Sequence, residues 1–149
     1  MSNAWWAYGS ELKIGNDGST ETFTKVAEII DIDGPSMSRD VIEVTNQDSA
    51  NGWREFIPGL RDGGEVSLTA NWVPASATQD GTAGVLSKFT DDALHNWQII
   101  TADDGSSGTM DIDFSAIVTD FSISLPLEEQ AQLEFTLKIS GAVTIAASA

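Results

Sequence analysis

The chain has no cysteine, a single histidine and few basic residues. Without cysteine it can form neither disulfide bonds nor thiolate metal sites, which fits synthesis in a reducing cytoplasm. Seven Lys and Arg residues stand against 23 Asp and Glu residues, so the formal net charge is −16. Proteins that grip nucleic acids use clustered Lys and Arg to neutralise phosphates, and this composition therefore argues against a DNA-gripping surface.

Long apolar runs are also missing. No stretch approaches the ~18 apolar residues of a membrane-spanning helix. Residues 1–8 lack the basic and apolar regions of a signal peptide. We therefore expect that the protein does not contact a membrane and that it is made in the cytoplasm. A length of 149 residues fits one domain with a single core.

Catalytic and metal-binding motifs are scarce. Acidic residues and serines surround His95, but no serine lies in a G-x-S-x-G nucleophile elbow, and we expect His95 to be an ordinary exposed residue after a helix. The acidic pairs Asp31/Asp33 and Asp111/Asp113 do not follow the spacing of a calcium-binding loop. The sequence predicts a protein with no catalytic residue, metal ligand or cofactor, and hence not an enzyme.

Alternating polar and apolar residues dominate the chain and predict β-strands. One helix is expected after Asp80, where Val85, Leu86 and Phe89 share a helical face. The apolar positions change phase between Val118 and Asp120, which predicts a β-bulge. Together these patterns favour a mainly β fold, a small β-barrel or sandwich with one flanking helix. The expected strands are a hairpin at 10–26 and single strands at 27–33, 40–45, 65–73, 97–101, 109–125 and 128–139.

The stretch 40–72 is the most informative part of the chain. Between its two strands we expect a loop of about twenty residues, far longer than a usual connection. The loop carries Trp53, Phe56 and Leu60, which are too apolar for a solvated linker. Trp and Arg dominate contact energies in protein interfaces, so Trp53 with Arg54 favours an interaction surface over a core tryptophan beside a solvated arginine.

The order D-V-I-E-V-T, a Ser/Asn/Gly-rich turn and G-W-R-E-F-I-P-G-L-x-D-G-G resembles the major tail tube proteins of long-tailed, siphophage-like bacteriophages. The residues that carry the resemblance are Asp40, Val44, Thr45, Ser49, Gly52, Trp53, Arg54, Glu55, Pro58, Gly59, Leu60, Asp62, Gly63 and Gly64.

This resemblance implies a structural subunit that forms hexameric rings, stacked into a hollow tube through which DNA passes. The subunit would lie in the virion tail, after a period in the host cytoplasm. Its implied partners are other copies of itself, tail tip and tail terminator proteins, and, inside the lumen, the tape measure protein and genomic DNA, held without sequence preference. Residues 1–141 would form one tail-tube domain with an inter-subunit loop at 46–63, and we expect 142–149 to be a flexible C-terminal tail.

Two residue sets follow as site predictions. The contacts between subunits or stacked rings are assigned to Asn46, Asp48, Ser49, Trp53, Arg54, Glu55, Phe56, Pro58 and Gly59. The polar faces of two strands are candidates for the lumen wall, or else for the outer surface, and comprise Glu65, Ser67, Thr69, Asn71, Gln132, Glu134, Thr136 and Lys138. The strong acidity suits a lumen that repels DNA phosphates, and equally suits a protein that must stay soluble before assembly.

Two other functions fit the same sequence. A tube subunit of a contractile injection or secretion machine would look alike at this level. A monomeric carbohydrate-binding β-sandwich would use Trp53, Trp72 or Trp97 as a stacking platform for sugars. At the N-terminus, Trp5 and Trp6 are adjacent and cannot both point inward from a strand, so one of them is expected to cover another surface or a neighbouring subunit.

Overall fold

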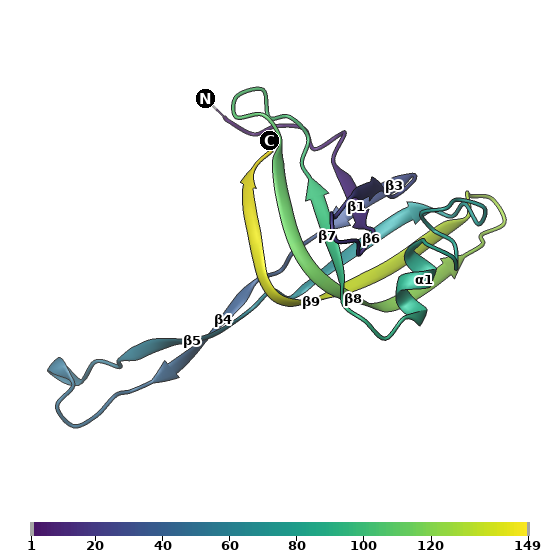
Figure 1. Ribbon diagram of the computed structural model, residues 1–149. Coiled ribbons are helices and arrows are strands. Elements are labelled where there is room, and N and C mark those ends of the chain that lie inside the picture. The colour runs from purple at the N-terminus through teal and green to yellow at the C-terminus, as the bar shows by residue number, and fades with distance from the viewer. Residues whose placement is uncertain (1, 149) are drawn as a thin grey trace.

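The computed structural model describes residues 2–148 (Figure 1). Polar and apolar residues alternate along most of its strands, as the sequence pattern predicts, and the fold has one short α-helix. The elements in chain order are β1 (Glu11–Gly15), β2 (Phe23–Lys25), β3 (Ile29–Asp33), β4 (Ser38–Glu43), the 3-10 helix η1 (Ala50–Gly52), β5 (Phe56–Asp62), β6 (Glu65–Asn71), α1 (Val85–Thr90), β7 (His95–Ile100), β8 (Met110–Ser124) and β9 (Gln132–Ala147).

Seven strands form one strongly curved antiparallel sheet in the order β2-β1-β7-β8-β9-β6-β3. No strand ladder joins the end strands β2 and β3 within residues 2–148, so the described sheet is not closed into a barrel. The remaining strands, β4 and β5, pair only with each other and project away from the sheet as a long hairpin (Figure 1). The predicted mainly β fold with one flanking helix is confirmed, and we name residues 38–62 the arm.

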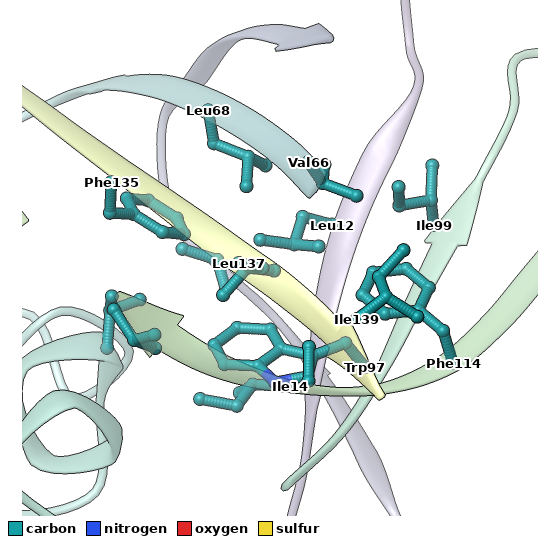
Figure 2. Packing of buried hydrophobic residues seen from close by; sticks show 14 of the residues in the cluster. Leu12, Ile14, Val66, Leu68, Trp97, Ile99, Phe114, Phe135, Leu137 and Ile139 are labelled. Carbon is teal, nitrogen blue, oxygen red and sulfur yellow. The ribbon is translucent and has the colours of Figure 1, made fainter. Parts of the chain in front are cut away.

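The core fills the inner side of the curved sheet (Figure 2). Trp97 of β7 is fully buried at its centre, with Phe114 of β8 and Phe135 of β9 in the same cluster. Burying an apolar side chain of this size contributes about 1.5–3 kcal/mol, so the alternating strands supply most of the driving force for folding. The other members of the buried cluster are Leu12, Ile14, Val26, Val66, Leu68, Val85, Ile99, Ala116, Val118, Leu133, Leu137 and Ile139.

The predicted bulge in β8 is confirmed. The pairing of β8 with β9 shifts register between Val118 and Asp120. Before the shift Val118 faces the core, and after it Phe121 lies opposite the buried Phe135. One inserted residue exchanges the two faces of a strand, and this is how β8 keeps Val118 and Phe121, on either side of the bulge, turned toward the core.

The predicted helix is confirmed as α1 and packs against β8, where the rings of Phe89 and Phe121 lie 6.3 Å apart. Ahead of the helix, Asp80 Oδ1 accepts hydrogen bonds from the backbone N–H groups of residues 82–84. These bonds lower the pKa of Asp80. The buried Gln79 joins this connection to the sheet, because its Nε2 donates to the carbonyl of Asn71 at 3.0 Å.

Two predictions about chain organisation are wrong. Much of the predicted loop at 46–63 is strand, since Phe56–Asp62 pairs with β4 and leaves 44–55 as the tip of a hairpin. The predicted flexible tail at 142–149 is also strand through residue 147, because β9 continues alongside the first half of β8 and pairs Ala147 with Met110. Residue 149 lies outside the described residues.

Candidate assembly surfaces

The arm is a two-stranded ribbon without a core of its own. Residues of β4 are exposed at every position, and only one position of β5 is partly buried. Ile42 and Ile57 lie opposite each other on the ribbon, and both are about half exposed. An isolated two-stranded hairpin is marginally stable in water, and exposed apolar residues of this density mark interaction sites. The exposed large apolar residues of the arm are Val41, Ile42, Val44, Trp53, Phe56, Ile57 and Leu60.

Polar side chains shape the tip of the arm. Ser49 Oγ donates to Glu55 Oε2 at 2.7 Å and accepts from the backbone N–H of Asn46 at 3.0 Å. Asn46 Oδ1 accepts from the backbone N–H of Asp48 at 2.8 Å. This network holds the chain in the turn that precedes Trp53, whose side chain is 74% exposed.

The predicted contact residues therefore fall into two groups. Asn46, Asp48, Ser49, Trp53, Arg54 and Glu55 come together at the tip of the arm. Phe56, Pro58 and Gly59 lie along strand β5. The interpretation of Trp53 as a core tryptophan is wrong for the single subunit, because no part of the core reaches the tip.

The eight predicted lumen candidates share the outer, polar face of β6 and β9. The two strands are paired so that Glu65 lies opposite Lys138 and Thr69 opposite Glu134. Lys138 also reaches Asp62 at 3.3 Å. A hydrogen bond from the backbone N–H of Gly64, together with Lys138, lowers the pKa of Asp62. The remaining two pairs are Ser67 with Thr136 and Asn71 with Gln132.

This polar face extends further than the sequence pattern of β6 and β9 predicts. Gln98 of β7 donates to Asp113 of β8 at 2.9 Å, and Ser115 donates to Asn96 at 2.7 Å. These side chains alternate with the buried Phe114, and that alternation was the signal available in the sequence. The polar face thus continues from β6 across β9 and β8 to β7, interrupted on β8 by the exposed Ile117 opposite Lys138.

The two end strands leave free backbone edges, and the N-terminal aromatic residues lie near one of them. Trp5, Trp6 and Tyr8 border a groove of about 710 Å³ that is also lined by Ile30 of β3. Trp6 stacks on Tyr8 with 4.9 Å between ring centroids. Trp5 is 45% exposed and Trp6 79% exposed, so neither tryptophan enters the core.

His95 is buried, contrary to the prediction of an exposed residue. Its Nδ1 lies 2.7 Å from Asp17 Oδ2, which also accepts from Lys88 Nζ at 2.9 Å. Partial burial of Asp17 would raise its pKa, but the hydrogen bonds from Lys88 and His95 outweigh that effect and lower it. The cluster fastens the β1–β2 turn to α1 and β7, a structural role. Within residues 2–148 no group of three His, Asp or Glu side chains is arranged to hold a metal ion.

A family model described as lambda phage tail tube protein, TTP, matches residues 6–146. The chain belongs to the lambda phage tail tube protein family. It is thus a structural tail tube subunit, as the resemblance in 40–64 implies. No curated protein sequence matches the chain.

Several solved tail tubes have the same fold as this family member. A tail of an empty gene transfer agent particle, solved with C6 symmetry, has a TM-score of 0.74 at 20% identity, covering 97% of this chain and 100% of the other. A chain in the sheath-tube complex of an extracellular contractile injection system (PVC) has a TM-score of 0.69 at 17% identity, covering 97% of this chain and 93% of the other. The SPP1 tail tube has a TM-score of 0.69 at 11% identity, covering 97% of this chain and 80% of the other.

The fold also bears on the carbohydrate-binding alternative. Trp97 is fully buried and offers no face to a sugar, and Trp72 packs against the core.

Among the described residues, no helix is long and apolar enough to cross a membrane.

Proposed function

We propose that this tail tube protein assembles into hexameric rings that stack into a tube for DNA passage. The proposal rests on the arm. Exposing a hairpin with seven large apolar residues to water is energetically unfavourable in a free subunit, and a neighbouring copy that covers the hairpin accounts for it. The C6 symmetry of the gene transfer agent tail, whose subunit has this fold, supports six copies per ring.

Ring closure would use the free edges of the sheet. The end strands β2 and β3 each leave one side of their backbone without a strand partner in the described sheet. Such edges invite pairing with another chain, and a repeated head-to-tail contact that closes removes all of them. In this arrangement the arm contacts a neighbouring subunit or ring through Trp53 and Arg54 at its tip and through Phe56, Pro58 and Gly59 along β5.

The polar face of β6 and β9 is the proposed lumen wall. Its side chains are hydroxyls, amides and carboxylates with one lysine, and that lysine is engaged by Asp62. A surface of this kind gives DNA phosphates no cluster of cations to bind, so the polyanion would slide. The tape measure protein would occupy the same channel, and tail tip and terminator proteins would cap the tube.

Electron microscopy of the concentrated, purified chain tests the assembly directly. We expect rings or tubes with sixfold symmetry. Monodisperse single subunits at all concentrations, whether or not they bind glycans, would rule out the proposal. A lumen with neutral or positive surface potential in the reconstructed tube would rule out the sliding role of the acidity while leaving the assembly intact.

The absence of cysteine allows a second test of the lumen assignment. Ser67→Cys places one thiol on the polar face, and Ser106→Cys places a control thiol in the exposed turn between β7 and β8. In free subunits both thiols should react with a bulky maleimide. In long tubes, where the reagent reaches the lumen only through the two ends, the Ser67→Cys variant should be labelled much more slowly than the Ser106→Cys variant. Equal labelling of the two variants in tubes would place the polar face outside.

A further inference from the structure

Two arginines face each other at the root of the arm. Arg39 of β4 pairs directly with Arg61 of β5, and both are exposed. Like charges in directly opposed positions destabilise a β-ladder. No ion pair within 4.0 Å involves either arginine among residues 2–148, although the chain has 23 acidic residues. The root of the arm therefore presents two cations that lack an anion in the described subunit.

These arginines border a groove of about 420 Å³ where the arm meets β9. Met37, 54% exposed, and the partly exposed Val143 supply its apolar lining. Its one carboxylate, Asp62, is already engaged by Lys138 at 3.3 Å. A fitting occupant is thus a short segment with apolar side chains and two carboxylates. The remaining lining residues are Ser38, Gly63, Gly141 and Ala142.

The turn between β8 and β9 has this chemistry. Leu125 is 69% exposed and Leu127 is 99% exposed, so both leucines point into solvent in the single subunit. They are followed by the exposed, adjacent Glu128 and Glu129, neither of which forms an ion pair with the described residues. A fully exposed leucine at the tip of a turn contributes favourable burial free energy only if another surface covers it.

The turn cannot reach the groove of its own subunit. It lies at the end of the sheet away from the root of the arm (Figure 1). Along β9 the stretch from Gln132 to Gly141 spans about 30 Å at roughly 3.3 Å per residue. A contact between the two surfaces must therefore join different copies, and it is heterologous because the two patches differ.

We propose that the 125–129 turn of one copy docks into the groove at the arm root of the next copy. Leu127 packs against Met37 and Val143, while Glu128 and Glu129 pair with Arg39 and Arg61. The inference rests on the proposed self-assembly and adds to it a specific contact, in which two exposed carboxylates meet two exposed guanidinium groups.

Charge reversal on each side tests the contact. Arg39→Glu with Arg61→Glu shifts the formal charge from −16 to −20, and Glu128→Lys with Glu129→Lys shifts it from −16 to −12. If only net charge governed assembly, the two double variants would change it in opposite directions. We expect both to raise the critical concentration for tube formation at least tenfold, and the fourfold variant, with charge −16 again, to recover most of that loss.

Leu127→Ser provides a test without charge change. The side chain of Leu127 is 99% exposed in the single subunit, so the melting temperature should stay constant while assembly weakens. Charge-reversed variants that fold and assemble like the wild type, or that lose assembly without recovery in the fourfold variant, would overturn the docking. Wild-type chains that form no tubes would instead overturn the proposed function, and the docking with it.

Discussion

Replacing Trp53 by alanine should weaken the contacts between subunits without destabilising the single subunit. The side chain is 74% exposed at the tip of the arm and far from the core cluster. Exposed substitutions away from special features change the free energy of unfolding by about 0.5 kcal/mol or less. We therefore expect Trp53→Ala to melt within a degree or two of the wild type.

The expected loss on assembly is larger. A tryptophan that becomes fully buried removes about 150–250 Å² from water. At roughly 25 cal/mol per Å², burying the exposed 74% of Trp53 would contribute about 3–5 kcal/mol to the contact. Interface tryptophans at hot spots cost about 2 kcal/mol or more when truncated. A loss of about 2–4 kcal/mol weakens a contact roughly 30-fold to several-hundred-fold, because about 1.4 kcal/mol corresponds to a factor of ten.

Pelleting assays over a concentration series measure this effect as the critical concentration for tubes. Trp97→Ala is the contrasting variant, since removal of a fully buried tryptophan should cost about 3–5 kcal/mol of folding stability. An unchanged critical concentration for Trp53→Ala would refute the assignment of the arm tip to a subunit contact. A Trp53→Ala melting curve displaced as far as that of Trp97→Ala would refute the premise that Trp53 lies outside the core.

Other predictions concern the parts of the fold that hold the subunit together. Gly64→Ala should lower the melting temperature and disturb the arm, because Gly64 has a φ of +75° and an added Cβ would collide with the carbonyl oxygen of Ser36. The pKa of Asp17 is lower in the folded state than its unfolded value near 3.8, so Asp17 stabilises the fold above that value and the stabilisation is lost as pH falls through the folded pKa. Asp17→Asn should therefore flatten the acid side of a plot of melting temperature against pH. An unchanged acid side would show that the ion cluster with His95 does not stabilise the fold. Deleting 142–149 should lower the midpoint of urea unfolding, because 144–147 pair with β8. An unchanged midpoint would support the interpretation of 142–149 as a flexible tail.

Much of the sheet could be predicted because its strands have one buried and one solvated face. In β9 the buried Leu133, Phe135 and Leu137 alternate with polar residues, and this period identifies both the strand and its inward side. The bulge in β8 was predictable for the same reason, since only an inserted residue reconciles Val118 and Phe121 with a single core.

The arm strand β5 was not predictable from such a pattern. Both faces of Phe56–Asp62 are exposed, so burial imposes no alternation on its sequence. Pro58 and Gly59 also argue against a strand, although proline is tolerated where a strand has a free edge, as β5 has. The strand at 142–147 was missed for a similar reason: it pairs with the distant start of β8, and only Val143 in it is partly buried, so burial imposes no alternation on its sequence.

The contacts that depend on long-range pairing left no local signal. His95 alternates with the buried Trp97 and Ile99 on the inward face of β7, but nothing beside it in the sequence identifies its partner Asp17, 78 positions earlier in the chain. The opposition of Arg39 and Arg61 depends on the register of the arm, which includes a bulge between Arg39 and Val41. The residue types on the arm were enough to identify candidate site residues. Their arrangement in space follows only from the pairing of β4 with β5.

The root of the arm couples the two parts of the molecule. The arm leaves the sheet at Gly63, where an added Cβ would collide with the side chain of Ile139, a core residue of β9. Close by, the backbone N–H of Ile139 donates to the carbonyl of Gly64 at 3.0 Å, and Lys138 holds Asp62. The direction of the arm is therefore set by packing against the core. A substitution at this root redirects every contact made further out on the arm, so assembly can fail there while the surface of the arm stays chemically unchanged.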